Sequence, residues 1–494
     1  MQKKLLAAAV LSAFAGAASA QSANVTLYGT LQGSFEFASA TGADTSAAGA
    51  STSSTRGTPA FASTGISAGT YNANAANQGI RTRMNPAGSN FGLRGTEDLG
   101  NGLSAWFQIE MATTLGAPPP NAGVNHGNAV SFRNTAVGVR SRTWGSIGVG
   151  SWDTPFNLIA VSTAQANGRS GAASTGMQSN LLGATTFGYG AWSAQSAASA
   201  CAAAGGGAAG AGCFNYGTNF DRRERGGLMW WSPNWSGFEA RVHYHATMDS
   251  GAITGGNRVN GSALKPSIWS MSLAYNNGPL AIGYGYDRQD DLLAYAAQLS
   301  SPAANVGGMG AGTGTGAWSI PVQPTTANAN SIDGSKGTGH RLGGKYAFNL
   351  GGGSSLGLSA MWESLKWTMS YVGTPAATTA NLTELKKTAW RLQANYSTGA
   401  HFFGIEYTKA NDLKGSVNNA AGTANSFNGG GSAARGIILS YNYMLSKRSS
   451  VTAYYTDIRN DTNANYSGIV FGGMAGVAAG ADPKYYGLYL RHSF

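Results

Sequence analysis

The sequence predicts an all-β protein, a 16-stranded antiparallel transmembrane β-barrel. Three observations lead to this fold class. Apolar and polar residues alternate with period two over many short stretches, and the connections between these stretches are either short or long. Only 11% of the 494 residues are charged, against about 25% in a typical soluble domain. The mean hydropathy of −0.15 argues against a bundle of membrane helices.

The chain begins with a predicted export signal over residues 1–20, which leaves residues 21–494 for the barrel. Lys3 and Lys4 form a basic start, an apolar stretch follows, and Ala18-Ser19-Ala20 has the small residues of a cleavage site. Cleavage removes both lysines and lowers the formal net charge from +11 to +9. The remaining chain has no run of about 18 apolar residues that could form a transmembrane helix.

The first strand is expected from Val25 to Phe37, where odd positions are mostly apolar and even positions mostly polar. Similar alternation occurs at 238–245, 280–287, 356–363, 390–396 and 485–494. A soluble β-sandwich also alternates, but with its apolar face turned inward. The sandwich does not explain the export signal, the two classes of connection, or the Tyr and Trp residues at strand ends, which suit the interfacial girdles of a membrane barrel.

Short turns and long loops alternate along the chain. Turns rich in Gly, Pro, Asn and Ser are predicted at 97–102, 142–146, 232–237, 276–279, 349–354, 397–400 and 445–448. Long segments lie at about 38–77, 116–128, 153–225, 248–266, 290–336, 370–385, 411–432 and 460–483. These connections join 16 strands and place both chain ends on the short-turn side, as in barrels with tight periplasmic turns. Side chains cannot fill a barrel of this size, so we expect a water-filled lumen.

Five stretches carry a family resemblance. They are the start Val25–Gly29, the segment Asn90–Gly100 (NFGLRGTEDLG), the pair Phe132–Val139 and Trp144–Gly150, and the aromatic ending Leu490–Phe494. Together they resemble the general-diffusion porins of Gram-negative outer membranes, specifically the β-proteobacterial group. The resemblance implies a homotrimer whose third loop, here about 153–225, folds inward to constrict the pore. It also implies passive passage of small hydrophilic solutes and ions, no cofactor, and recognition of the terminal Phe494 by the barrel-assembly machinery.

The resemblance also indicates constriction residues. In the resembled porins, basic side chains on early strands face acidic side chains on the third loop. The matching positions here are Arg81, Arg83, Arg94 and Arg133, with Asp153 as the best acidic candidate. This chain departs from the family pattern, because it has Ser151 where Arg is common, and because Thr154 to Phe220 contains no Asp or Glu and only one charge, Arg169.

An unbalanced positive constriction would concentrate anions, so we expect an anion preference. The alternative is that these arginines pair with Glu97 or Asp98, or meet lipopolysaccharide phosphates outside the pore. By alternation, eight further charges should face the lumen: Glu36, Glu110, Glu239, Arg241, Arg341, Lys345, Arg391 and Glu406.

The remaining candidate sites are few. Cys201 and Cys213 lie 12 positions apart and form a candidate disulfide, with two free thiols as the alternative. His243 and His245 share one strand face; we favour lumen-lining residues over a metal site, because no third ligand is near. The basic residues are dispersed, which argues against nucleic-acid binding.

Two other functions stay open as alternatives. A barrel hydrolase would need Ser or carboxylates with His at the rim, and His126 is the one histidine placed in an outer loop. An adhesive barrel would use its Gly-, Ala-, Ser- and Asn-rich loops to bind a surface. We expect neither, and the scattered histidines give no indication of an enzyme. The outer membrane, with its lipid and lipopolysaccharide, is the expected location.

Overall fold

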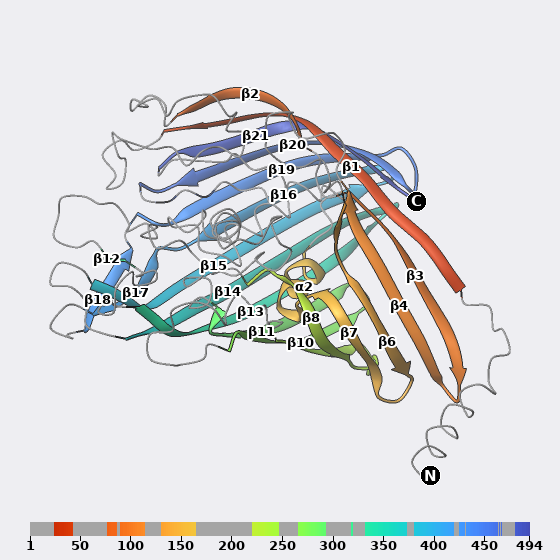
Figure 1. Cartoon of the computed structure of the whole chain (residues 1–494). Coiled ribbons are helices and arrows are strands. Elements are labelled where there is room, and N and C mark those ends of the chain that lie inside the picture. Colours follow the sequence, from red (N-terminus) through yellow and green to blue (C-terminus); the bar gives the residue numbers. More distant parts are fainter. Residues whose placement is uncertain are drawn as a thin grey trace, which may run out of the picture.

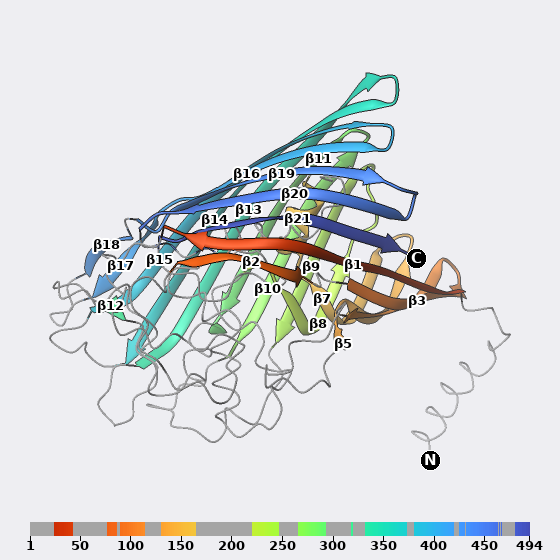
Figure 2. The ribbon, with the colours of Figure 1, turned by 90° about the horizontal axis from the view of Figure 1, so that it is seen from above.

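The structure is a computed structural model. It describes residues 24–42, 77–85, 89–113, 130–164, 220–246, 265–292, 318–319, 331–372, 380–418, 424–429, 431–462, 464, 466 and 480–494. The predicted signal over residues 1–20 lies outside these ranges, and so do most residues of the predicted long loops. Within the ranges, nearly every residue belongs to one antiparallel sheet that closes on itself (Figures 1 and 2).

The barrel wall contains 16 strands, as predicted. They are β1 (Asn24–Thr41), β2 with β3 (Gln78–Asn85 and Ser89–Gly100), β4 (Leu103–Thr113), β5 with β6 (Val130–Phe132 and Thr135–Ser141), β7 (Gly145–Asp153), β8 (Arg223–Trp231), β9 (Phe238–Ala246), β10 (Ser267–Asn277), β11 (Leu280–Asp290), β13 (Ser331–Gly351), β14 (Ser354–Val372), β15 (Ala380–Thr398), β16 (His401–Ala410), β19 (Ala434–Met444), β20 (Ser449–Asn460) and β21 (Asp482–Ser493). Strands β2 and β3 count as one because both pair with β1, and β5 and β6 count as one because both pair with β4.

The sheet closes between its first and last strands. Strand β1 pairs with β21 in antiparallel register, from Thr30 opposite Ser493 to Thr41 opposite Asp482. All seven predicted short turns join neighbouring antiparallel strands. At the first of them, Asn101 and Gly102 both have positive φ angles, 53° and 77°, which Asn and Gly tolerate best.

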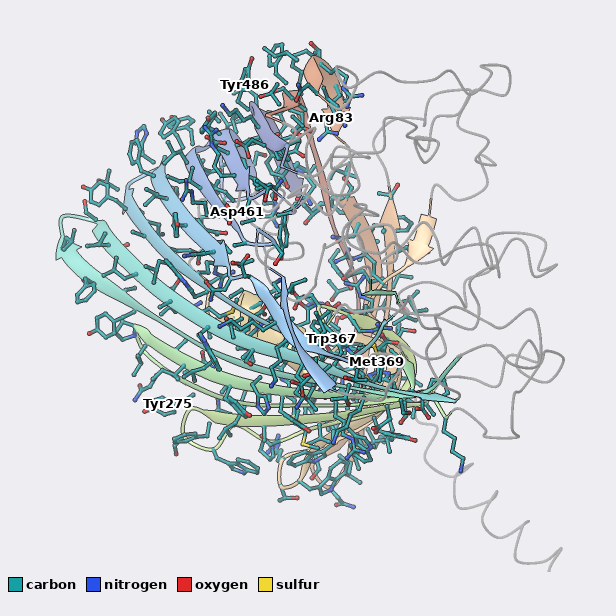
Figure 3. All side chains as sticks on the ribbon, turned by 90° about the vertical axis from the view of Figure 1, so that its left-hand side faces the viewer. Arg83, Tyr275, Trp367, Met369, Asp461 and Tyr486 are labelled. Carbon is teal, nitrogen blue, oxygen red and sulfur yellow. The ribbon has the colours of Figure 1, made fainter. Side chains whose placement is uncertain are left out.

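The outward face of the wall is apolar, as the alternation predicts. On β11, Ile282 and Tyr284 are 45% and 42% exposed. Farther along the same strand, Asp287 and Gln289 are buried on the inward face. In Figure 3 the exposed Tyr486 lies on the outside of the barrel and the buried Trp367 on the inside. A soluble sandwich would have the opposite arrangement. The exposed apolar face therefore supports a barrel that contacts lipid.

Some elements differ from the predicted layout. Strands β13, β14 and β15 span 21, 19 and 19 residues and extend into segments predicted as loops. The segment predicted as a loop over 411–432 contains a hairpin, β17 (Leu413–Asn418) and β18 (Ala424–Gly429). Strand β17 pairs with the first part of β15, from Asn381 to Lys386. Two residues, β12 (Trp318–Ser319), pair in parallel with β15.

The one helix in the described part of the chain, α2 (Pro155–Ser162), begins two residues after the end of β7. Thr154 caps it by accepting a hydrogen bond from the Asn157 N–H at 3.3 Å, and Pro155 occupies the first turn, where its missing N–H is harmless. Figure 1 shows α2 inside the ring of strands. Among the described residues no helix is both long enough and apolar enough to cross a membrane.

Candidate functional site

The first part of the third loop lies against the inner wall of the barrel. Helix α2 contacts the inward faces of β10, β11 and β13. The wall is lined with glycine where the helix approaches it: a Cβ atom on Gly283 would come within 2.7 Å of the Ile159 Cδ1 atom, and one on Gly343 would meet the Thr163 side chain. Phe156 and Ile159 are buried in this contact. Inward-facing glycines therefore provide the space that the helix occupies.

Arg341 is the central attachment of α2. Its guanidinium donates to the Phe156 carbonyl at 3.2 Å, to Asp221 at 2.6 Å and to Glu363 at 2.7 Å. It also lies 4.1 Å from the centre of the Phe156 ring. Burial raises the pKa of the Asp221 carboxyl, and the neighbouring Arg341 opposes that shift. This network joins both ends of the third loop to β13 and β14.

Two more of the predicted lumen-facing cations hold the helix. Arg391 donates to the Ala160 carbonyl at 3.0 Å, and Lys345 donates to the Ala164 carbonyl at 3.3 Å. Arg341 and Arg391 are inward-facing, as expected from alternation, but they are buried. These two side chains therefore position α2 and do not line the water-filled part of the lumen.

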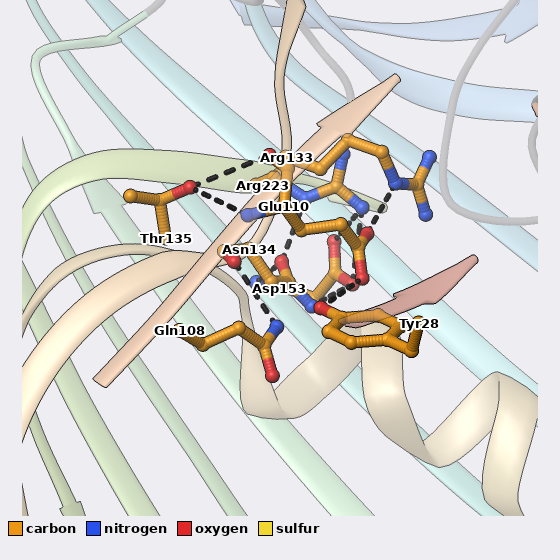
Figure 4. Close-up of polar contacts among 8 residues, drawn as sticks. All are labelled: Tyr28, Gln108, Glu110, Arg133, Asn134, Thr135, Asp153 and Arg223. Carbon is orange, nitrogen blue, oxygen red and sulfur yellow. Dashed lines mark hydrogen bonds and ion pairs between the residues drawn. The ribbon is translucent and has the colours of Figure 1, made fainter. Parts of the chain in front are cut away.

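A second polar cluster lies on the wall formed by β1, β4, β6, β7 and β8 (Figure 4). Arg133 forms an ion pair with Glu110, and Glu110 also accepts a hydrogen bond from the Tyr28 hydroxyl at 3.0 Å. Arg223 lies 2.9 Å from Asp153 and also donates to Asn134 at 2.7 Å. Both arginine side chains are partly exposed, so each can meet a passing ion while its charge is partly balanced.

Asp153 therefore has a cationic partner that the sequence reasoning did not include. Arg223 begins β8 and belongs to the run Asp221-Arg222-Arg223-Glu224-Arg225, which follows the long segment without acidic residues. This cluster of charged residues is the feature of the sequence that indicates a possible partner for Asp153. Because Asp153 is paired with Arg223, it adds little net negative charge to the constriction.

The remaining basic candidates also face inward. Arg81 and Arg83 stand opposite Ala38 and Glu36, which are buried on the inward face of β1. Arg83 forms an ion pair with Glu36, and Arg81 donates to Gln78.

Arg94 lies over the Tyr28 ring, 5.2 Å from its centre, and is exposed. In the described part of the chain, no carboxylate lies within ion-pair distance of Arg94, and neither Glu97 nor Asp98 pairs with any arginine. Arg94 is therefore a basic candidate with an accessible, unbalanced charge.

The other two predicted lumen acids, Glu239 and Glu406, also have polar partners. Glu239 lies 3.4 Å from Arg241, and Glu406 is buried and accepts from Gln393 and Thr408. Lys345 has no carboxylate within ion-pair distance among the residues with described placement. Positive charge therefore exceeds negative charge on the accessible inner wall.

His243 and His245 face inward, but the prediction that they line the water-filled lumen is wrong. Both are buried, and His243 Nε2 accepts from the Trp231 indole at 2.8 Å. Trp231 stacks on Trp106, with ring centres 5.2 Å apart, in an indole cluster that fills this part of the wall. The described residues contain no group of three His, Cys, Asp or Glu side chains able to hold a metal ion.

The candidate disulfide and the terminal Phe494 remain to be placed. Cys201 and Cys213 lie outside the described residues, so the disulfide stays a prediction. Phe494 exchanges main-chain hydrogen bonds with Gly29, at 3.0 and 3.1 Å, and its ring lies where a Gly29 side chain would be. The terminal residue is thus part of the seam that closes the barrel.

Comparison with known proteins agrees with this fold. A family model described as Gram-negative porin matches residues 7–463. An outer membrane porin protein of Bordetella pertussis is 28% identical over 295 residues, which cover 58% of this chain and 60% of that protein. The anion-selective porin from Comamonas acidovorans has the same fold, with a TM-score of 0.53 and 17% identity over 96% of this chain and 100% of that chain. The chain therefore belongs to the Gram-negative porin family and is a protein of the outer membrane.

Proposed function

We propose that the chain forms a water-filled channel through which small hydrophilic solutes and ions diffuse passively, with a preference for anions. The observation that carries the proposal is the charge of the inner wall. Arg94 and Lys345 have no carboxylate partner in the described residues, while Glu36, Glu110 and Asp153 each pair with an arginine. The solved porin from Comamonas acidovorans, whose fold this chain shares, is itself described as anion-selective.

The physical basis is electrostatic focusing. Low-dielectric walls concentrate field lines in a narrow aqueous path, so a small excess of one sign of charge changes the local concentration of ions. The segment from Thr154 to Phe220 carries no acidic residue that would oppose the arginines. Anions should therefore be enriched in the lumen and cations depleted.

The assembly and partners are part of the same proposal. We infer a homotrimer that contacts outer-membrane lipid and lipopolysaccharide, and whose Phe494 is recognised by the barrel-assembly machinery during insertion. The support is the family membership and the position of Phe494 at the seam. Transport by diffusion needs no cofactor and no covalent step.

Liposome swelling tests the channel itself. Purified protein in liposomes should admit sugars, at rates that fall as the size of the sugar increases. Empty liposomes and heat-denatured protein are the controls. Folded protein that admits no sugar would contradict the channel and would favour an adhesive barrel.

A further inference from the structure

Three tryptophans form a cluster on the wall of the barrel that the charge of the wall does not explain. Trp106 comes from β4, Trp152 from β7 and Trp231 from β8. The ring centres of Trp106 and Trp231 lie 5.2 Å apart in a stacked arrangement. The Trp152 ring lies 6.1 Å from the first and 5.0 Å from the second. Three adjacent indoles give this part of the wall a large apolar area.

The cluster faces the lumen. Trp231 follows the buried Met229 by two residues on β8, so both side chains lie on the inward face. On the opposite face of the same strand, Leu228 is 53% exposed, as expected for a residue that contacts lipid. Trp106 and Trp152 contact the Trp231 ring and therefore lie on the same side of the wall.

Trp106 is the base of the cluster. It is buried, and its indole N–H donates to the Ser146 hydroxyl at 2.8 Å. Its ring covers Gly138 and Gly148 on two neighbouring strands, where a Cβ atom would come within 2.7 Å of the ring. The two glycines leave the space that the ring fills, so Trp106 packs the wall and is not open to a solute.

The other two rings are accessible. Trp152 and Trp231, which we call the indole pair, are both partly exposed, and their planes meet at 58°. Trp231 is held in place because its N–H donates to His243 Nε2 at 2.8 Å. Among the described residues, nothing accepts a hydrogen bond from the Trp152 N–H. The indole pair therefore offers apolar ring faces and one free donor.

An exposed ion pair stands beside these rings. Arg241 is opposite Trp231 in the register of β8 and β9, and its guanidinium lies 5.9 Å from the centre of the Trp231 ring. One guanidinium nitrogen lies 3.4 Å from Glu239, and each of the two side chains is about one third exposed. A guanidinium has five N–H donors and a carboxylate has about four acceptor positions, so one contact leaves most of them available.

This combination fits the chemistry of a neutral pyranose sugar. One face of a pyranose ring is a patch of C–H groups, which stacks on an indole because both surfaces leave water and because the indole face is electron-rich. The hydroxyls at the edge of the sugar need donors and acceptors in place of water. Arg241 and the Trp152 N–H supply donors, and Glu239 supplies acceptors.

The balance of charge disfavours an ionic ligand at this place. Each described cation on or just before β7, β8 and β9 has an acidic partner: Arg241 has Glu239, Arg223 has Asp153, and Arg222 has Glu224. A ligand with a net charge would be attracted by one member of such a pair and repelled by the other. A neutral ligand that both donates and accepts hydrogen bonds avoids this repulsion.

We propose that the indole pair, together with Arg241 and Glu239, binds pyranose sugars as they pass through the lumen. The inference rests on the proposed channel function and adds a solute class to it. Pyranose sugars would pass through a saturable step at this site. Solutes of similar size without a pyranose face would pass without being retained.

Block of the ion current by sugar tests the site. The conductance of channels in a planar bilayer is titrated with glucose, and with sorbitol, which has a similar size but an open chain and corrects for viscosity. Phenylalanine is the third probe, because it would stack on the indole pair as an aromatic zwitterion. The variants are W152A and E239Q/R241Q, which keeps the net charge. The matched control is W362A, because Trp362 is 47% exposed on the outward face of β14.

Glucose should block wild-type and W362A channels in a saturable manner, and sorbitol should not. The block should need about threefold to tenfold more glucose in W152A, which loses one stacked ring, and about fivefold more in E239Q/R241Q, which loses charged hydrogen-bonding groups. Equal block in wild type and W152A, or equal block by glucose and sorbitol, would overturn the proposal. Block by phenylalanine without block by glucose would also overturn it.

Two outcomes separate this inference from the channel itself. If wild-type protein conducts ions but glucose does not block the current, the sugar site is wrong and the channel stands. If folded wild-type protein does not conduct at all, the proposed channel function is wrong and the sugar site with it. Should W152A fail to fold, Trp152→Phe keeps a ring on the wall and removes the free N–H, with an expected loss of about threefold.

Discussion

Arg341 and Glu363 face each other across β13 and β14 inside the barrel, with Nη2 2.7 Å from Oε2 and both side chains fully excluded from solvent. The same guanidinium contacts Asp221 and the Phe156 carbonyl. One buried side chain thus joins the wall to the beginning of the third loop at α2 and to its end before β8.

Replacing Arg341 with Gln should destabilise the barrel by about 3 kcal/mol, because Glu363 and Asp221 would stay buried without the Arg341 guanidinium. It should also release α2 from the wall and increase the noise and size of the single-channel current. Urea unfolding and planar-bilayer recording measure the two effects. R288Q, which breaks an exposed pair, is the control and should cost less than about 1 kcal/mol. Unchanged stability and conductance in R341Q would show that Arg341 does not hold the helix.

Adjacent glycines on β13 provide a matched pair for the packing of α2. A Cβ on Gly343 would overlap the Thr163 side chain, whereas one on Gly344 would make ordinary contacts at 3.6 and 3.7 Å. Gly343→Ala should therefore destabilise the protein by about 1 to 3 kcal/mol, and Gly344→Ala by much less. Thermal unfolding in detergent compares the two. Equal losses would mean that α2 does not lie against β13.

Arg94 should control ion preference without affecting stability, since it is exposed and has no carboxylate partner among the described residues. Arg94→Gln should lower the anion-to-cation permeability ratio by about twofold to fivefold, which corresponds to a lost attraction of about 0.4 to 1 kcal/mol. Arg133→Gln should have a larger effect because it also leaves Glu110 unpaired. The outward variant R435Q is the control and should leave the ratio unchanged.

Phe494 should matter for assembly more than for transport. Phe494→Ala keeps the two main-chain hydrogen bonds to Gly29 but removes the ring that covers it. The fraction of protein that migrates as folded barrel in a heat-modifiability gel of outer membranes should fall several-fold. Channels that do fold should conduct as the wild type does. A normal folded fraction in F494A would remove the assembly role.

The strand layout could be predicted because its signals are local. The alternation of Ile282 and Tyr284 with inward-facing residues on β11 gives the outward face directly, and short turns such as Asn101-Gly102 have their own chemistry. The same alternation places charges such as Glu36 and Arg391 on the inward face, where both are buried. Residues two apart on a strand share a face whatever the rest of the chain does.

What covers an inward residue could not be predicted. Arg341 and Arg391 lie under α2, which reaches them from more than 180 residues away in the sequence. The pairing of Asp153 with Arg223 likewise spans the third loop. Such contacts depend on the path of a loop, and Thr154-Pro155 indicates only where a helix can start. The register that opposes Lys409 to Arg435 also becomes visible only once β16 is seen to pair with β19.

The proposed anion preference depends on an excess of positive charge on the inner wall. The most direct test is the reversal potential of the wild-type channel in a planar bilayer with a tenfold gradient of potassium chloride. The zero-current potential should have the sign of selective chloride flow and should move toward zero in R94Q. A reversal potential with the sign of potassium selectivity would contradict the account.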